Sequence, residues 1–214
     1  MTREDKIQKL EEIAKEVRTC QACSLWREAT NGVPGEGDSE AEIMFIGEGQ
    51  GFNENQQGRP FVGQAGKLLD QLLSTIGARR QKVFITNIVK HRPPNNRDPL
   101  PIEIEACRQY LDEQIRIIEP KIIVTLGRFS LNRFLPGEYI SRAHGLARYW
   151  DFAGRKIIVL PLYHPAAALR SDSVRAQLQE DFKKIKILRE ERNSSIDKTE
   201  KSAKSANEQL SFIN

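Results

Sequence analysis

The chain has 214 residues, of which 39% are hydrophobic, and this is enough for one well-packed domain but too little for two large ones. Its apolar runs, such as 43–47 and 157–162, are far shorter than the roughly 20 residues that span a bilayer, so we expect no transmembrane segment. With 33 Lys and Arg against 29 Asp and Glu, the chain is mildly basic, which permits an anionic partner without requiring one.

The N-terminal residues carry acids and lead into an amphipathic pattern without the apolar core of a signal peptide. We therefore expect a cytoplasmic protein in a reducing setting. Three cysteines in such a setting do not indicate a disulfide framework.

The predicted elements alternate between helices and apolar strands. Residues 7–17 have helical spacing, and an apolar strand over 43–46 runs into a glycine-rich loop. The remaining elements are a helix over 65–76, a strand over 83–88, a helix over 102–118, a strand over 122–126, a short helix ending at Phe134, a strand over 157–160 and a helix over 173–188. Apolar strands separated by helices predict a three-layer αβα sandwich around a four-stranded, mainly parallel sheet.

The C-terminal stretch 189–214 differs from the rest in its composition. It is polar, its charges balance, and it has no apolar stripe until its last few residues. Such a segment cannot bury enough surface to offset the entropy of ordering. We therefore predict one folded domain over 1–188 and a disordered tail over 189–214.

Three candidate motifs follow predicted strands. They are the loop Gly47–Gly51, Asn87 and His164. In parallel α/β sheets the ligand crevice lies beyond the carboxyl ends of the strands, so these motifs are expected to lie along one edge. This convergence predicts a functional site there.

Each motif also has an ordinary structural interpretation. The glycines could cradle a phosphate or form a plain turn, and because no helix opens at once, a dinucleotide-binding fold is disfavoured. Phe61, in a polar stretch, could stack on a flat ring or anchor a surface loop. The Asn87 amide could read the edge of a base or cap a turn. His164 could stabilise a developing anion or be a satisfied core histidine.

Four residues suit a metal centre: Cys20, Cys23, His91 and Cys107. Two residues between Cys20 and Cys23 allow both sulfurs to bind one metal ion or cluster. A redox pair is the alternative, but the pair follows a helix instead of opening one after a strand. Zinc and an iron–sulfur cluster both remain open from the residues alone.

A basic, turn-rich stretch over 79–97 lies near the same predicted edge. It includes Lys90 and Arg97 and could follow a phosphate backbone, although such clusters are usually solvated surface.

Six separated motifs, taken in order, resemble the family 4 uracil-DNA glycosylases, which hold an iron–sulfur cluster. They are Gly47-Glu48-Gly49-Gln50-Gly51 with Glu54, the stretch Gly58–Gly66, Thr86-Asn87, the stretch Arg92–Pro99, the stretch Glu105–Arg108 and the stretch His164–Arg170. The similarity covers about residues 7–188 and leaves the tail outside.

The resemblance implies a monomeric enzyme of base-excision repair that flips uracil out of DNA and hydrolyses its N-glycosidic bond, and it implies a nucleoid-associated location. By position, Phe61 would stack on the base, Asn87 would bind its Watson–Crick edge, and Gly47, Glu48 and Gly49 would contact it. The implied catalytic residues are His164 and Glu54, and the implied DNA contacts are Leu169 as a wedge and Arg170. The implied [4Fe-4S] ligands are Cys20, Cys23, His91 and Cys107, with zinc as the second choice.

The chain departs from the family pattern at three positions. Gln50 replaces a proline, Asn55 replaces an acid, and His91 stands where the third cluster ligand is usually cysteine. Loss of a carboxylate could lower the rate or change which damaged base is accepted, so the alternative function is a DNA-binding module of the same fold, without turnover or with a broader range of deaminated bases. The short 95–105 segment has no basic insert of the covalent-trapping branch, which favours turnover.

The last residues, Gln209-Leu210-Ser211-Phe212-Ile213, resemble a short sliding-clamp peptide of the bacterial type. A glutamine and spaced apolar side chains at the end of a flexible tail suit a tethered ligand. A sliding clamp is therefore an expected partner beside uracil-containing DNA.

Overall fold

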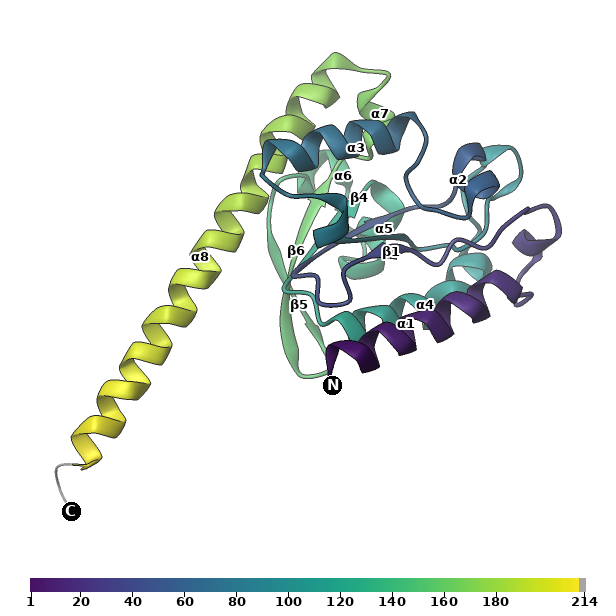
Figure 1. Cartoon of the computed structure of the whole chain (residues 1–214). Helices are drawn as coiled ribbons and strands as arrows, with labels where there is room; N and C mark the ends of the chain where they lie inside the picture. Colours follow the sequence, from purple (N-terminus) through teal and green to yellow (C-terminus); the bar gives the residue numbers. More distant parts are fainter. Residues whose placement is uncertain (212–214) are drawn as a thin grey trace.

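The computed structural model describes the backbone of residues 1–211 and the side chains of residues 1–191 (Figure 1). The elements, with η for 3₁₀ helices, are α1 (Arg3–Thr19), η1 (Ser24–Arg27), β1 (Glu36–Gly37), β2 (Ile43–Gly47), α2 (Phe52–Gln57), α3 (Gln64–Thr75), η2 (Arg80–Lys82), β3 (Phe84–Asn87), η3 (Pro94–Asn96), α4 (Pro101–Ile118), β4 (Ile122–Leu126), α5 (Arg128–Phe134), α6 (Ile140–Ala143), β5 (Arg148–Phe152), β6 (Arg155–Leu162), α7 (Pro165–Ala168) and α8 (Asp172–Ser211).

The sheet confirms the predicted three-layer architecture and adds two strands to it. Its order is β1-β3-β2-β4-β6-β5, and the four central strands are parallel. The edge strands β1 and β5 are antiparallel and were not predicted. β1 is only two residues long, which is too short for a sequence pattern, and β5 forms a hairpin with β6 through Ala153 and Gly154, both at positive φ.

Helices cover both faces of the sheet, because successive strand side chains point to opposite sides. Phe45, Val124 and Leu160 pack with α3 and α8 on one face. Met44 and Ile123 pack with α4 and α5 on the other. In Figure 1, α1 and α4 lie side by side on one side of the sheet, while α3 and α7 lie on the opposite side. The buried positions of each strand thus alternate between two separate cores.

The helix α8 continues beyond its predicted end. The sequence predicted a helix to Leu188 and a disordered tail from residue 189, whereas the helical backbone runs from Asp172 to Ser211. The stretch contains neither glycine nor proline, so no residue in it breaks a helix. Figure 1 shows the C-terminal half of α8 leaving the body of the molecule.

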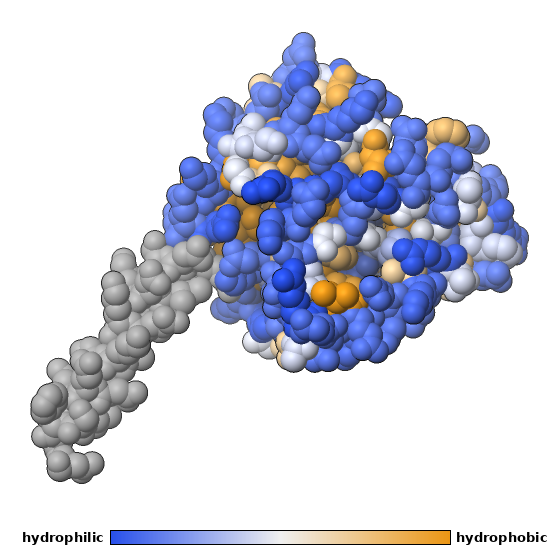
Figure 2. Space-filling model, in the orientation of Figure 1, coloured by the Kyte–Doolittle hydropathy of each residue, from blue (hydrophilic) through white to orange (hydrophobic). Residues whose placement is uncertain are grey.

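The face of the body that Figure 2 displays is predominantly hydrophilic. In Figure 2, hydrophobic residues appear on the displayed face of the body only as separate patches between hydrophilic ones. No helix among the described residues has both the length and the apolar character needed to cross a membrane.

Candidate active site

A cavity of about 610 Å³ lies where the parallel strands end. β2 and β3 are paired so that Gly47, the last residue of one, stands opposite Asn87, the last residue of the other. The predicted site residues that line the cavity are Glu48, Gly49, Glu54, Phe61, Asn87, His164 and Arg170. The structure therefore brings together the motifs that the sequence placed along one sheet edge.

Asn87 presents a buried amide to this cavity. Its Nδ2 donates a hydrogen bond to Gln50 Oε1 at 2.9 Å. Its Oδ1 is buried and has no hydrogen-bond partner among the side chains that the structure describes. The backbone of Asn87 is anchored from behind, because Lys90 Nζ donates to its carbonyl oxygen at 3.0 Å. A buried, unsatisfied acceptor in a cavity is costly unless a ligand satisfies it.

His164 is the N-cap residue of the short helix α7, and it lines the cavity just after the end of β6. Its Nδ1 accepts a hydrogen bond from the backbone N–H of Ala166 at 3.1 Å. Burial lowers the pKa of His164 to about 4, and the opposing effect of the Glu54 carboxylate is smaller. The imidazole is therefore neutral near pH 7, and because Nδ1 is an acceptor, the proton resides on Nε2.

Phe61 is held in a strained backbone conformation. Its φ is 51°, which is uncommon for a residue other than glycine, and its side chain is buried. Gly66 makes this possible, since a Cβ there would lie 1.8 Å from the Phe61 carbonyl oxygen. Arg80 Nη1 donates to that same oxygen at 3.0 Å. The ring stacks against the His164 imidazole with centroids 5.6 Å apart.

Arg80 is itself fixed by acids. Its Nε donates to Glu36 Oε1 at 2.5 Å, and its Nη1 donates to Asp70 Oδ1 at 3.0 Å. The arginine also donates to the Pro60 carbonyl oxygen. The loop that carries Phe61 is therefore tied to β1 and α3 through one guanidinium group.

Glu54 and Asn55 are neighbours on α2 with different surroundings. Glu54 Oε1 accepts hydrogen bonds from the backbone N–H groups of Val62 and Gly63, both at 2.8 Å. Its Oε2 lies beside Gly51, a lining residue. Asn55 is buried away from the cavity lining, and its Oδ1 accepts from the Thr30 backbone N–H at 2.9 Å. Because Asn55 lies away from the cavity, its difference from the family motif does not remove the Glu54 carboxylate from the site.

The glycine loop brings the backbone close to the aromatic ring. A Cβ on Gly47 would lie 2.6 Å from the Phe61 ring and 2.3 Å from Asn87 Oδ1, so only glycine fits there. Gly47 is not itself among the lining residues. Burial, with a smaller contribution from Asp98, raises the pKa of the Glu48 carboxyl.

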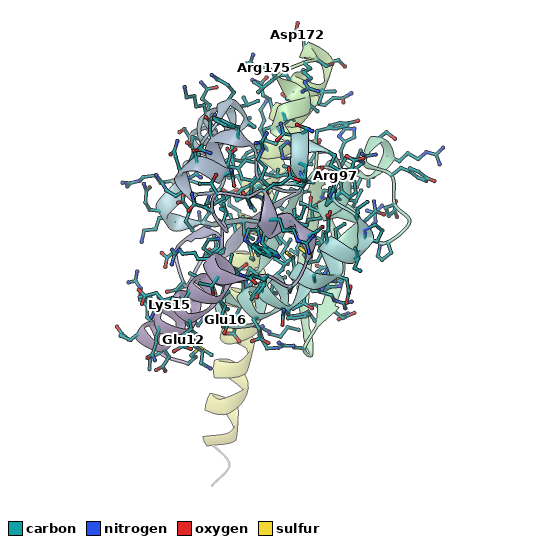
Figure 3. All side chains as sticks on the ribbon, turned by 90° about the vertical axis from the view of Figure 1, so that its right-hand side faces the viewer. Glu12, Lys15, Glu16, Arg97, Asp172 and Arg175 are labelled. Carbon is teal, nitrogen blue, oxygen red and sulfur yellow. The ribbon has the colours of Figure 1, made fainter. Side chains whose placement is uncertain are left out.

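Arginines surround the mouth of the cavity. Arg97, Arg128 and Arg170 are lining residues, and Arg97 pairs with the buried Glu103 through two hydrogen bonds of 2.9 and 2.6 Å. Figure 3 looks onto the side on which α2 lies in Figure 1, and Arg97 is labelled near the middle of that side. Leu169 follows α7 and is 47% exposed beside this cavity.

The predicted basic stretch over 79–97 is not a continuous phosphate-binding surface. Lys90 is fully buried and donates to Thr86 Oγ1 at 2.7 Å and to Gln114 Oε1 at 2.9 Å. Arg80 is engaged with acids and carbonyl groups, as described above. Both basic side chains are hydrogen-bonded within the protein and do not face DNA, and burial lowers the pKa of Lys90 to about 7.

Several lining residues were not selected from the sequence, among them Gln50, Asn96 and Arg128. Arg128 opens α5 one residue after Gly127, which itself follows the end of β4, so the same carboxyl-edge argument could have found it. Gln50 was noted only as a departure from a motif. Asn96 lies in a short 3₁₀ turn at positive φ, and no pattern in the sequence indicates its direction.

The four candidate metal ligands lie on segments that converge beside α4. All three cysteines are free thiols. The Cys107 thiol hydrogen-bonds to Cys23 and holds the pKa of Cys23 at about 6, while that contact and burial raise the pKa of Cys107. The Lys90 backbone N–H donates to Cys107 Sγ at 3.4 Å, and burial lowers the pKa of His91.

These residues have the chemistry of a soft-metal donor set. They offer acidified thiol, a neutral imidazole and an N–H group directed at sulfur, which all suit an iron–sulfur cluster or zinc. Among residues 1–191, however, no three His, Cys, Asp or Glu side chains are arranged to hold a metal ion. The four predicted ligands therefore have side chains that suit an iron–sulfur cluster or zinc. Among the described residues, however, they are not arranged in a metal-coordinating geometry.

The fold and cavity define an α/β protein with a site for a flat, hydrogen-bonding ring: an aromatic platform, a neutral imidazole and an unsatisfied amide oxygen surround one cavity. Residues 34–186 match the Uracil DNA glycosylase superfamily, and the chain belongs to this family.

Three relatives show how close the similarity is. The type-4 uracil-DNA glycosylase of Sulfurisphaera tokodaii is 55% identical over 84% of each chain. That of Archaeoglobus fulgidus is 46% identical over 84% of this chain and 92% of its own. That of Thermotoga maritima is 44% identical over 83% of this chain and 93% of its own.

Proposed function

We propose that this chain is a uracil-DNA glycosylase, which flips uracil out of DNA and hydrolyses the bond between the base and deoxyribose to leave an abasic site. The observation that carries the proposal is the cavity itself, where Asn87 Oδ1 has no hydrogen-bond partner among the described side chains and His164 carries its proton on Nε2. Family membership and the type-4 names of the relatives support it.

In this proposal the base is recognised by one ring and one amide. Phe61 provides a flat apolar face on which the uracil ring stacks. Asn87 Oδ1 accepts the N3–H of uracil, and the remaining hydrogen on Nδ2 donates to O4. Backbone groups of Glu48 and Gly49, which line the cavity, contact the base, while Gly47 leaves room for the Phe61 ring and Asn87.

Bond cleavage moves an electron pair from the C1′–N1 bond onto the uracil ring, where the negative charge spreads to O2. The neutral His164 stabilises this charge by donating its Nε2–H. The electron-poor C1′ of the sugar then gains a hydroxyl group from water, and the proton that this water loses ends, by way of solvent, on the departing uracil anion. Glu54 Oε2 is the group that orients this water and balances the positive charge on the sugar.

The DNA must be held open while the base is outside the helix. Leu169, exposed at the mouth of the cavity, fills the gap in the stack as a wedge. Arg170 contacts the phosphate backbone beside it, and phosphate contacts of this kind give binding that weakens as salt rises.

We also propose that Cys20, Cys23, His91 and Cys107 hold a [4Fe-4S] cluster, with zinc as the second choice. The free thiols, the acidified Cys23 and the Lys90 N–H directed at Cys107 support it. When bound, the cluster would tie the end of α1 to the segment after β3 and to α4, a structural role. The segment after β3 continues to the lining residues Pro93, Asn96 and Arg97, so loss of the cluster would loosen the site.

The finer expectations about partners and location rest on sequence. The clamp-like segment 209–213 lies outside the residues whose side chains the structure describes. We propose that it binds a sliding clamp and that the enzyme acts as a monomer at the nucleoid, where its substrate is.

Release of free uracil from DNA tests the proposed activity. A single-stranded oligonucleotide with one radiolabelled uracil is incubated with the protein, and the released base is separated by chromatography. The proposal expects labelled uracil from this DNA and no base release from an oligonucleotide with thymine in the same place. Tight binding to uracil-containing DNA with no released base would favour the alternative, a binding module without turnover.

A further inference from the structure

A chain of three hydrogen-bonding groups lies buried behind the base-recognition edge of the cavity. Gln50 Nε2 donates to the Val89 carbonyl oxygen at 3.1 Å. Gln50 Oε1 accepts from Asn87 Nδ2 at 2.9 Å. Both side chains are almost wholly buried, with exposures of 2% for Gln50 and 1% for Asn87. Water therefore has little access to replace either bond.

The direction of this chain is dictated by its first member. A carbonyl oxygen has no hydrogen to give, so only the NH₂ group of Gln50 can face Val89. The peptide unit that carries this carbonyl is held from its other side, because the Lys90 N–H in the same unit donates to Cys107 Sγ at 3.4 Å. Gln50 must then direct its Oε1 toward Asn87, so Asn87 donates to that oxygen through Nδ2.

The orientation of the Asn87 amide decides which base edge it can meet. With Nδ2 turned to Gln50, Oδ1 is left beside Gly47 as a buried acceptor without a partner among the described side chains. Uracil offers a donor at N3 and an acceptor at O4, whereas cytosine offers an acceptor at N3 and a donor at N4. An amide free to rotate by 180° could pair with either base, but an amide held in this orientation matches uracil alone.

We propose that Gln50 is a specificity-determining positioning residue, which fixes the Asn87 amide in the orientation that accepts uracil and rejects cytosine. The inference rests on the proposed uracil excision and deepens it. It also gives a function to the position where the sequence departs from its family motif: Gln50 sharpens discrimination between the two bases instead of merely altering the rate.

The direct test is Gln50→Met, which keeps the length of the side chain and removes both hydrogen bonds. Single-turnover kcat/KM is measured on single-stranded oligonucleotides that carry uracil or cytosine at the same position, so that base pairing does not contribute. We expect the uracil-to-cytosine ratio to fall about 10- to 100-fold, the usual effect of one or two buried hydrogen bonds. The matched control is Gln57→Met on the exposed side of α2, which should keep the wild-type ratio.

Two further variants separate positioning from packing. In its protonated form, Gln50→Glu keeps an oxygen toward Asn87 and an O–H donor toward the Val89 carbonyl oxygen, so this form should preserve the wild-type ratio. In an Asn87→Ala background there is no amide to orient, so Gln50→Met should leave the ratio of that background unchanged. Melting temperatures of all the variants show whether each one is folded.

Two results would overturn the inference. One is a folded Gln50→Met variant with the wild-type ratio, and the other is an equal change of ratio in the Asn87→Ala background. Calorimetric binding of free uracil and free cytosine distinguishes this failure from that of the proposed function. A wild-type protein that excises nothing contradicts the enzyme, but if it still prefers uracil and Gln50→Met loses that preference, the positioning role stands.

Discussion

The backbone N–H of Ala166 donates to Nδ1 of His164, and this one bond of 3.1 Å settles where the imidazole carries its proton. The donor belongs to the first turn of α7, which His164 caps, so the tautomer is fixed by the way β6 passes into that helix. Nε2 is left as a preorganised donor toward the cavity.

Replacing His164 by Ala should slow the chemical step and leave DNA binding almost intact. Removing one preorganised donor to a developing oxyanion costs about 10²- to 10³-fold in kcat. Single-turnover kinetics measure the loss, and fluorescence anisotropy with a non-cleavable uracil analogue measures binding. Replacement of the other histidine outside the metal site, His144→Ala, is the control, and equal rates for wild type and His164→Ala would remove His164 from the mechanism.

The activity should not follow the titration of an ordinary histidine. Burial lowers the pKa of His164 from 6.5 to about 4, so the neutral form that donates from Nε2 persists as pH falls through 6.5. The single-turnover rate should therefore show no inflection near pH 6.5 that depends on His164. An inflection there that disappears in His164→Ala would contradict the neutral-imidazole mechanism.

The same lowered pKa affects stability. The unfolded chain takes up a proton on this histidine near pH 6.5, and the folded chain takes it up only near pH 4. The contribution of His164 to the free energy of unfolding is therefore fully present above pH 6.5 and is lost as the pH falls from 6.5 to 4. When the pH is lowered from 7.5 to 5, the melting temperature of the wild type should fall further than that of His164→Gln. Equal losses in the two proteins would mean that His164 titrates normally in the folded state.

Arg80 should act on the site through the backbone of Phe61. Arg80→Met removes the donors to the Pro60 and Phe61 carbonyl groups, so the strained loop should relax and the stacking platform should shift. We expect a loss of about 1–3 kcal/mol in unfolding free energy, because the Pro60 and Phe61 carbonyl groups and the partly buried Glu36 lose a donor, together with a higher KM. Chemical denaturation and steady-state kinetics measure the two effects, and the exposed neighbour Arg79→Met should show neither.

The metal centre is tested by colour, metal content and stability. Protein purified without oxygen should be brown, with broad absorbance near about 400 nm from sulfur-to-iron charge transfer. Cys107→Ser should lose iron and lower the melting temperature, whereas Ser39→Cys, which adds a thiol away from the four ligands, should not change the iron content. Stoichiometric zinc in a colourless wild-type protein would support the second choice of metal.

Much of this site could be predicted because its residues follow strand ends. Asn87 ends the apolar strand β3 and His164 follows shortly after β6, and the carboxyl-edge rule of parallel sheets is enough to place them together. The two edge strands were not predicted. β1 has only two residues, which is too few for a sequence pattern, and the turn of the β5–β6 hairpin depends on a positive φ at Ala153, which the sequence does not indicate.

The partners of each polar side chain could not be predicted. In the sequence, Gln50 and Asn55 are both polar residues that differ from the family motif. In the structure, Gln50 accepts a hydrogen bond from the Asn87 amide at the cavity, whereas Asn55 accepts one from the backbone N–H of Thr30. Likewise, Lys90 and Arg97 read as one basic stretch, although only Arg97 reaches the cavity lining. Side-chain direction within loops depends on tertiary contacts that leave no periodic signal.

The central claim is catalytic excision of uracil, and counting turnovers tests it most directly. Purified protein is incubated with a tenfold excess of single- or double-stranded oligonucleotide that carries one uracil, and abasic sites are cleaved with alkali and counted over time. The account predicts several products per protein molecule, with the loss in His164→Ala described above. Tight uracil-specific binding with no more than one product per molecule would contradict it.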